Sequence, residues 1–465
     1  MGTMTGPLAK LPAKLPEEAA DFLAAHPETR TVDAIFADLS GIVRGKRYPI
    51  DHLAKLYGGE IAMPASVYLL DATGQSHDPG GRGFSDGDPD AGVRVVPGSL
   101  KPVPWADRPS CQVMITLVEK DERPYPFEPR NLLARVAERF AALDLRPVVA
   151  FELEFYLLDR ERRPDGAPQP PVSPVTGVRD RGTQVYGMAE IDAFAALLDD
   201  IAEACAAQDI PSSAMTAEYA PGQFEINLQH VADPMLAADH CVLFKRAVKG
   251  VARRHGVQAS FMAKPYLDQT GCGLHLHISL QDKTGRNVFD GGAAPASAVL
   301  EHAVGGILDI MPESMAMLAP NVNSFRRFQP NVFVPIRRTW GFENRSTALR
   351  IPLGRGEARR IEHRIAGADA NPYLALATAL AGIHHGIVNQ IAPPPAFEGN
   401  AGFAFDQDLP FRPRPALARL VESEVLTDYL GPEYPRLYAA CKTKELEAFE
   451  RHIGTREYDW YLQPE

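Results

Sequence analysis

Two glutamates stand two residues apart inside an apolar run, residues 147–158 (PVVAFELEFYLL), and this limits how the chain folds. A run of this kind predicts a buried β-strand, in which residues two apart share one face. Two carboxylates on one face of a buried strand are unfavourable unless water or a positive group meets them. We therefore expect Glu152 and Glu154 to face solvent, an arginine or bound cations.

Three further segments place ionisable side chains in strand-like sequence. They are 218–225 (EYAPGQFE), 271–279 (GCGLHLHIS) and 359–364 (RRIEHR). Each segment alone is also explained by a solvated hairpin, a satisfied core histidine or a surface strand. Together they supply an oxygen-rich ligand set with one imidazole and no thiolate, which suits Mg²⁺ or Mn²⁺. The candidate ligands, numerous enough for two or three ions, are Glu152, Glu154, Glu218, Glu225 and Glu362, with one of the two imidazoles of 271–279.

An excess of arginine between residues 326 and 364 needs a partner, because the whole chain is acidic. The chain has 48 basic and 59 acidic residues, yet this stretch holds ten arginines against three glutamates. A solvated basic face is one explanation. Arg345, Arg350, Arg360 and Arg364, however, lie in strand-like or apolar sequence, where guanidinium groups typically bind carboxylate or phosphate. Divalent cations beside arginines predict phosphoryl transfer from a nucleotide, although no Walker A or kinase glycine loop is present.

The order of strand and helix patterns predicts an α+β fold in more than one domain. A chain of 465 residues exceeds what one hydrophobic core usually supports, and prolines at 124, 126 and 129 mark a boundary. We expect an extension over residues 1–28, a small domain over 29–122 and a large domain over 123–465. The expected strands are 31–39, 111–118, 147–158, 218–228, 273–280 and 348–352, and the expected helices are 131–143, 191–208, 233–255 and 371–391.

Composition and cysteine usage predict a cytoplasmic protein. The net charge of −11 argues against nucleic acid and anionic membrane as partners. The five cysteines are scattered and form no C-x-x-C motif, which favours a reducing compartment. We find no apolar core of a signal peptide near the first residues and no membrane-spanning run.

Taken in order, these motifs resemble those of the glutamine synthetase family. Residues 38–46 (DLSGIVRGK) resemble the opening motif of its β-grasp domain. The motifs that resemble its catalytic domain are 151–155 (FELEF), 218–225, 273–279 (GLHLHIS), 344–352 (NRSTALRIP), 359–364 and 371–373 (NPY). The resemblance implies an N-terminal β-grasp domain and a catalytic domain with a curved antiparallel sheet and flanking helices. It also implies a homo-oligomeric ring, expected to be a dodecamer, with each site between neighbouring N- and C-terminal domains.

The resemblance implies a role for each matching residue. One divalent ion would lie nearer the glutamate substrate, held by Glu154, Glu218 and Glu225, and one would bridge the ATP phosphates, held by Glu152, His275 and Glu362. The residues implied to contact ATP are His277, Ser279, Arg345, Arg350 and Arg360. Those implied to contact glutamate are Glu154, Gly271, Arg327 and Arg364. Arg327, Arg345 and Arg364 would act in catalysis.

The activity that this resemblance implies is ATP-dependent ligation of glutamate to an amine. The γ-carboxylate of glutamate attacks the γ-phosphorus of ATP, and the resulting acyl phosphate is attacked by the amine. The metals and arginines neutralise charge on the transferring group. The choice between Mg²⁺ and Mn²⁺ stays open.

Two departures from the family pattern predict that the amine is organic. The family's Asp-Gly-Ser-Ser motif is replaced by residues 62–66 (AMPAS), and Phe333 in residues 327–335 (RFQPNVFVP) stands where a glutamate is usual. Thr270 also replaces the usual Asn. A bare ammonium ion needs carboxylates to offset its desolvation, whereas Pro64 and Phe333 suit a carbon chain.

The sequence therefore resembles the γ-glutamyl-polyamine and γ-glutamyl-monoamine synthetase branch, and a polyamine such as putrescine is favoured. The alternatives are alkyl or hydroxyalkyl monoamines, ammonia as in true glutamine synthetase, and a non-catalytic scaffold. The base that deprotonates the amine is unassigned, with Glu343 as a candidate near residues 327–335.

Overall fold

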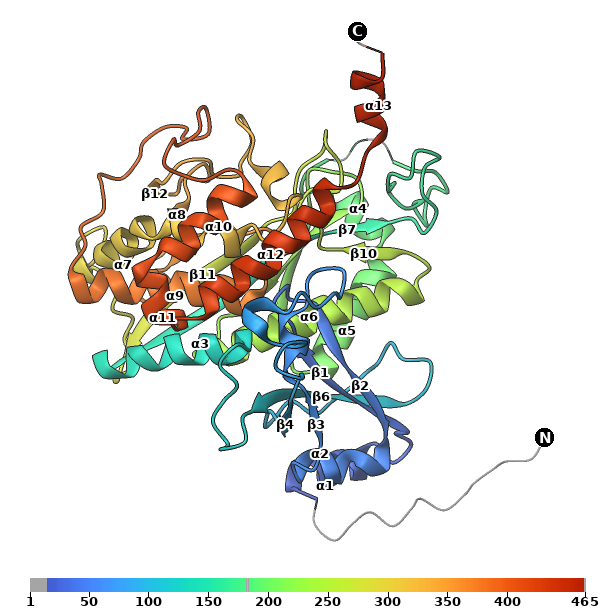
Figure 1. Cartoon of the computed structure of the whole chain (residues 1–465). Helices are drawn as coiled ribbons and strands as arrows, with labels where there is room; N and C mark the ends of the chain where they lie inside the picture. The colour runs from blue at the N-terminus through green and yellow to red at the C-terminus, as the bar shows by residue number, and fades with distance from the viewer. Residues whose placement is uncertain (1–14, 181, 183, 464–465) are drawn as a thin grey trace.

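The computed structural model describes residues 15–463 except 181 and 183, and it contains two β-sheets joined to a large helical body (Figure 1). Residues 1–14 of the expected extension lie outside the described part, and residues 15–28 include helix α1 (Glu17–Ala25). The strands of the small sheet lie between residues 31 and 118 and those of the large sheet between 145 and 363. The exact domain division at residue 122 stays a prediction.

The small sheet has the order β2-β1-β6-β4-β3, with β5 paired to β6. β1 and β6 run parallel and the other pairs are antiparallel. The predicted strands at 31–39 and 111–118 are confirmed as β1 and β6. The bounds are β1 (Thr31–Ala37), β2 (Val43–Pro49), β3 (Ala62–Pro64), β4 (Asp90–Val95), β5 (Lys101–Pro102) and β6 (Ser110–Val118), with helix α2 (Leu53–Tyr57) after β2.

The large sheet has the order β12-β13-β14-β11-β7-β9-β8, with β10 paired to β7. All of its pairs are antiparallel except β12 with β13, so the predicted antiparallel sheet is confirmed with one parallel pair at its edge. The bounds are β7 (Leu145–Leu158), β8 (Ser212–Ala217), β9 (Gln223–Leu228), β10 (Gln258–Ser260), β11 (Leu274–Asp282), β12 (Trp340–Phe342), β13 (Leu349–Ile351) and β14 (Ile361–His363).

Along strand β7, side chains alternate between the two faces of the sheet, with the period of two that its sequence predicts. Phe151, Leu153 and Phe155 are buried, and Phe155 packs against aromatic rings of β9 and the segment after β10. Helix α6 (Pro234–Arg254) covers this apolar face. Glu152 and Glu154 therefore lie together on the opposite, half-buried face, where the candidate site is built.

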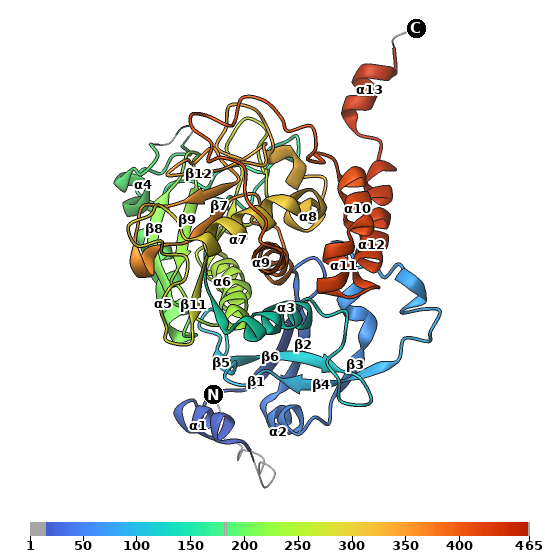
Figure 2. The ribbon, with the colours of Figure 1, turned by 90° about the vertical axis from the view of Figure 1, so that its left-hand side faces the viewer.

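Helix α9 (Pro372–Asn389) is the central buried helix, and α10 to α12 lie on the side of it away from the sheet (Figure 2). Its cap Asn371 accepts from the amides of Tyr373 and Leu374 and donates to the carbonyl of Asp38 in the small domain at 2.8 Å. The other helices are α3 (Pro129–Glu138), α4 (Met188–Ala193), α5 (Ala195–Ala207), α7 (Ala298–Asp309), α8 (Met311–Leu318), α10 (Pro413–Glu422), α11 (Glu424–Leu430), α12 (Tyr434–Glu450) and α13 (Thr455–Tyr461).

The helix predicted over 191–208 is divided into α4 and α5. Phe194 leaves helical geometry at φ −111° and ψ 17°, and its ring is buried against Phe224. Tertiary packing of one aromatic ring therefore breaks a helix that periodicity alone continues.

Among the described helices, none combines the length and hydropathy that a membrane span requires.

Glu128 is a buried acid at the junction of the small sheet and α3. Its side chain is 1% exposed and accepts from the Leu117 amide at 2.9 Å and the Thr116 hydroxyl at 2.8 Å. Burial raises its pKa from 4.5 to about 7, against the lowering effect of these hydrogen bonds. The unfolded chain therefore loses this proton at lower pH than the folded chain, so the contribution of Glu128 to stability falls between these two values and is constant above them.

We expect Glu128→Gln to stabilise the protein more at pH 8 than at pH 5. The side-chain oxygen of glutamine still accepts both hydrogen bonds but carries no charge. The gain should differ between the two pH values by about 2 kcal/mol. Denaturant unfolding at both pH values measures it, with the exposed Glu138→Gln on α3 as the matched control. A gain that is equal at both pH values would show that Glu128 does not titrate in this way.

Candidate active site

The central strands of the large sheet bring predicted metal ligands into neighbouring rows. Glu154 of β7 pairs with Glu225 of β9, and Glu152 pairs with His275 of β11. Two groups have candidate ligand atoms that all lie within 4.8 Å of one another, namely Glu152, His275 and Glu362, and Glu154, Glu225 and His275. Residues more than two hundred positions apart in the chain thus converge on one sheet face, with His275 common to both groups.

Glu218 lies beside these groups but in neither of them. It follows β8 in the turn that leads to β9, and its amide donates to the Gln223 carbonyl at 2.9 Å. The strand predicted over 218–228 therefore begins only at Gln223, because Gly222 turns the chain with φ +72°. Burial and the charges of Glu154 and Glu152 raise the pKa of Glu218 to about 7, which places its carboxyl in the same electrostatic field.

The carboxylates on this face repel one another, so the face needs positive charge. Burial and the charges of Glu152, Glu154 and Glu218 raise the pKa of Glu225 to about 10. Like charges directly opposite across a strand pair are destabilising. A divalent cation removes this repulsion and prefers carboxylate oxygen with one imidazole nitrogen. The donor set therefore fits the divalent ions that the sequence predicts.

Glu152 and Glu362 behave differently because hydrogen-bond donors or guanidinium groups already face them. Burial alone raises the pKa of Glu152, but His275 at 2.5 Å and His277 at 3.2 Å hold it well below its usual range. For Glu362, Arg364 and His277 outweigh burial and lower the pKa to about 2. These two carboxylates stay ionised and available to a metal over the physiological range.

Three of the four arginines predicted to bind phosphate or carboxylate lie against this set. Arg350 donates to Glu362 at 2.6 Å, and Arg360 donates through Nε to Nδ1 of His277 at 3.0 Å. Arg364 donates to Glu362. The Nε groups of Arg350 and Arg364 are buried without a hydrogen-bond partner among the described residues. Buried donors of this kind are normally satisfied, which indicates a place for an anionic ligand. Arg345 is exposed at the rim.

Arg327 is the most buried of the predicted substrate-binding arginines, at 3% exposure. One of its terminal nitrogens donates to the Ile365 carbonyl at 3.0 Å, while its Nε has no partner in the described part of the chain. Gly271 makes room for it, since a Cβ there would lie 2.7 Å from Cγ of Arg327. Gly271 therefore shapes the site by admitting the arginine side chain, a packing reason that the sequence alone does not show.

Residues 126–461 match the family model described as glutamine synthetase, catalytic domain. This chain belongs to the glutamine synthetase family. The family and the fold class predicted from the sequence are thus confirmed.

Three relatives of this family member show how far the likeness extends. The γ-glutamylputrescine synthetase PuuA of Escherichia coli K12 is 43% identical over 447 residues, covering 96% of this chain and 94% of that protein. A glutamate–isopropylamine ligase of a Pseudomonas species is 29% identical over 460 residues, covering 95% of this chain and 96% of that protein. A solved structure of GmaS without ligand matches with a TM-score of 0.80 and 27% identity, covering 96% of this chain and 99% of that chain.

Two polar residues of β9 that received no role from the sequence support the family's acids. Gln223 donates to Glu154 at 3.4 Å and to the Gly271 carbonyl at 3.0 Å, and it accepts from Thr270. Asn227 donates to Glu225 at 3.2 Å. Both lie two residues from Glu225 on the same strand. The period of two along 223–227 therefore predicts that they share the face of Glu225.

Part of the arginine excess is structural in this family member. Arg338 pairs with Asp406 at 3.4 Å and with Asp408 at 2.5 Å, outside the carboxylate set. Glu343, the candidate base, accepts from Arg350 at 3.3 Å and from the Leu353 amide. Its carboxylate is therefore already engaged in the free protein.

The two residues expected to contact the amine lie far apart within one chain. Phe333 is 58% exposed and lines a cavity of about 650 Å³ with Arg345 and residues 396–400. Pro64 ends β3 in the small sheet. Phe342 of β12 lines the same cavity as Phe333, and both ribbon views place β12 far from β3 (Figures 1 and 2). One chain therefore does not bring Pro64 to Phe333.

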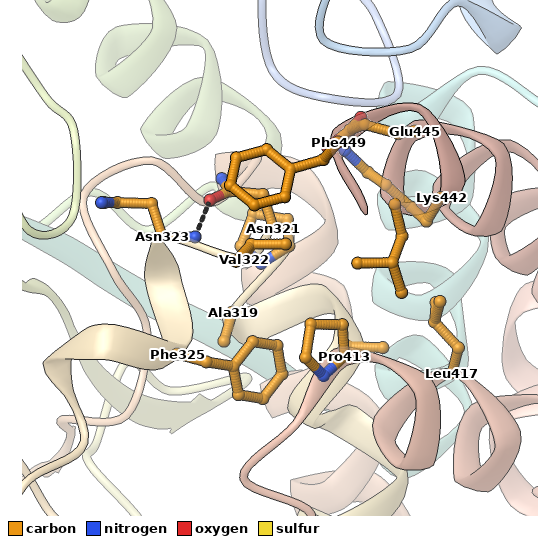
Figure 3. A pocket seen from close by; sticks show the side chains of 13 residues that line it. Ala319, Asn321, Val322, Asn323, Phe325, Pro413, Leu417, Lys442, Glu445 and Phe449 are labelled. Atoms are coloured by element: carbon orange, nitrogen blue, oxygen red, sulfur yellow. Dashed lines mark hydrogen bonds and ion pairs between the residues drawn. The ribbon is translucent and has the colours of Figure 1, made fainter. Parts of the chain in front are cut away.

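An apolar cavity of about 130 Å³ lies between the segment after α8 and helices α10 and α12 (Figure 3). Phe325, Pro413, Leu417 and Phe449 surround it, and Lys442 closes one side. None of the predicted ligands of metal, ATP or glutamate lines this cavity. It is separate from the candidate active site.

Proposed function

We propose that this enzyme joins the γ-carboxylate of glutamate to an organic amine and converts ATP to ADP and phosphate. The observation that carries the proposal is the pair of ligand groups that share His275, placed beside partly unsatisfied arginines on one sheet face. The chain's relatives include proteins named as γ-glutamylputrescine synthetase and glutamate–isopropylamine ligase, which supports an amine ligase.

The proposed metal ligands are the two groups of acids, with His275 assigned to one ion and Glu218 added to the other. Glu154, Glu225 and the nearby Glu218 would hold one ion, and Glu152, His275 and Glu362 a second, each either Mg²⁺ or Mn²⁺. When bound, such ions supply positive charge that stabilises the transferring phosphoryl group. The short contact between Glu152 and His275 fixes the imidazole tautomer and orientation, as a partner of a metal-binding histidine commonly does.

The arginines bind and orient the two anionic substrates. Arg345, Arg350 and Arg360, with His277 and Ser279, would face the ATP phosphates. Arg327 and Arg364 would hold the glutamate and its phosphorylated γ-carboxyl group. A γ-carboxylate oxygen forms a bond to the γ-phosphorus and ADP leaves. The amine nitrogen then bonds to the acyl carbon, phosphate leaves, and the amine loses a proton.

The amine site supports a carbon-bearing substrate. Phe333 offers an exposed ring beside Arg345, and Pro64 offers an apolar contact. Neither group offsets the desolvation of a bare ammonium ion. The higher identity to the putrescine-named relative favours a polyamine such as putrescine, and the isopropylamine-named relative keeps an alkyl monoamine as the second candidate.

A coupled ATP assay with glutamate and a panel of amines tests this function. The panel contains ammonia, putrescine, spermidine, ethanolamine, isopropylamine and n-butylamine. We expect glutamate-dependent ADP release with an organic amine at a kcat/KM above that for ammonia. A preference for ammonia would identify a true glutamine synthetase, and no ATP turnover with any amine would identify a non-catalytic scaffold.

We expect Phe333→Glu to shift this preference toward ammonia. A carboxylate at this position compensates a small cation but repels the apolar part of an alkylamine. The ratio of kcat/KM for ammonia to that for n-butylamine should rise by about tenfold. Phe333→Leu is the control that keeps an apolar side chain. An unchanged ratio in Phe333→Glu would place the amine elsewhere.

We also propose that the working enzyme is a homo-oligomer, with a dodecamer as the expected form. Pro64 reaches Phe333 only if it comes from a second copy of the chain. Mass by light scattering tests this, and a catalytically active monomer would contradict it.

The five cysteines are buried and unpaired, which supports a reducing, cytoplasmic setting.

A further inference from the structure

A third cavity, of about 360 Å³, lies beside the small sheet next to β3. Its volume is within the range typical of small-molecule sites, about 300–1,000 Å³. Its charged lining residues are five acids and three bases, which leaves a negative excess. They are Asp86, Asp88, Asp90, Glu119 and Asp121, with Arg82, Lys120 and Arg123.

The bases neutralise only part of this lining. Arg123 pairs with Asp121 at 2.7 Å and with Glu119 at 3.3 Å. Arg82 is engaged elsewhere, with Glu433 at 3.2 Å and over the ring of Phe127. Within residues 15–463, apart from 181 and 183, no ion pair is formed by the other three acids, which are Asp86, Asp88 and Asp90. Lys120 also lines the cavity and forms no ion pair among the described residues, so the lining keeps an excess of two negative charges.

The Tyr125 side chain and one carboxylate oxygen of Asp88 independently indicate a ligand here. The Tyr125 side chain lines the cavity at 5% exposure, and among the described residues no hydrogen bond to its hydroxyl is formed. One oxygen of Asp88 is also buried without a partner. Burial, together with the charges of Asp86, Glu119 and Asp88, raises the pKa of Tyr125 against the effect of Arg82, so the hydroxyl stays neutral. Unsatisfied buried polar groups are costly unless a ligand or water meets them.

The cavity begins where the amine is expected to pass. Pro64 pairs with Asp90 in the β3–β4 ladder, and the next residue, Ala65, lines the cavity and donates its amide to the Pro89 carbonyl at 3.3 Å. A carbon chain in contact with Pro64 would therefore lead directly toward Asp90. A linear diamine has a second ammonium group at the end of such a chain.

We propose that this cavity binds the distal ammonium group of a diamine substrate, with Asp88, Asp90 and the Tyr125 hydroxyl as its contacts. The proposal rests on the function proposed above, in which Pro64 of one copy contacts the amine. An ammonium group has three donors and no acceptor, which suits two carboxylates and a hydroxyl oxygen. A monoamine of the same length leaves these groups unmet, so the cavity selects diamines.

The test compares putrescine with n-butylamine, which has the same carbon chain and one ammonium group. The variant is Asp88→Asn combined with Asp90→Asn, which removes charge and keeps shape. Asparagine tolerates the φ of +48° at residue 88. We expect KM for putrescine to rise by about tenfold or more while the values for n-butylamine stay nearly constant. Asp107→Asn, an exposed acid of the same domain outside the cavity, is the matched control.

Tyr125→Phe is a second variant. It removes only the hydroxyl group and leaves the net charge and the packing of the ring unchanged. It should raise KM for putrescine in the same direction with kcat nearly unchanged. An equal effect on both amines, or no effect on putrescine, would overturn the proposal. If the unmodified enzyme turns over no amine, the proposed function itself fails, which is a distinct result. Activity with n-butylamine shows that each variant is folded.

Discussion

His275→Ala is expected to abolish most of the ligase activity. Its imidazole is a proposed ligand of the ion held with Glu152 and Glu362, and it also lies within the second group, so its loss would weaken the binding of that ion and alter the neighbouring site. We expect kcat/KM to fall by about a thousandfold, which corresponds to about 4 kcal/mol of transition-state stabilisation. Steady-state kinetics with saturating glutamate and amine measures the loss.

The same variant should lose the thermal stabilisation that Mn²⁺ and ATP give the unmodified enzyme, because ligands that bind the folded state raise its apparent stability. His255→Ala is the control, since that histidine lies at the end of α6 and pairs with Asp200 at 2.7 Å, outside the site. If His275→Ala retains both the thermal shift and the turnover, the two ligand groups are not metal sites.

Arg327→Lys is expected to raise KM for glutamate by about a hundredfold and to leave KM for ATP nearly unchanged. The guanidinium is planar and binds a carboxylate through two parallel hydrogen bonds, whereas an ammonium group is a single point of charge. The buried Nε of Arg327, which has no hydrogen-bond partner in the described part of the chain, is one such donor. Kinetics with each substrate varied in turn separates the two effects.

Arg326→Lys is a matched control because the neighbouring arginine is exposed. Thermal unfolding of both variants shows whether the fold is kept. A loss of stability in Arg327→Lys with an unchanged glutamate KM would mean that Arg327 supports the structure and does not bind the substrate.

The sequence identified the acids of the site through strand periodicity. Glu152 and Glu154 alternate with residues that must be buried, so their common face follows from backbone geometry. The pairing of Glu154 with Glu225 and of Glu152 with His275 depends on strand register, which no local pattern specifies across so many residues. The motif resemblance supplied that long-range information.

Tertiary packing decided the features that local patterns mispredicted or missed. Phe194 breaks a predicted helix because its ring enters the core, and Glu218 belongs to a turn because Gly222 reverses the chain. Gly271 is small because Arg327 lies against it. Each of these depends on a neighbour distant in the sequence.

By itself, the sequence determined the family, because the motifs follow in the family's order. It also predicted the types of metal ligand and an apolar amine contact, because these expectations follow from side-chain chemistry at regular spacings. Only the tertiary structure decided that His275 joins two ligand groups, that Pro64 lies far from Phe333, and that an acidic cavity adjoins Pro64. These are distances between segments that the chain brings together or keeps apart when its sheets and helices pack.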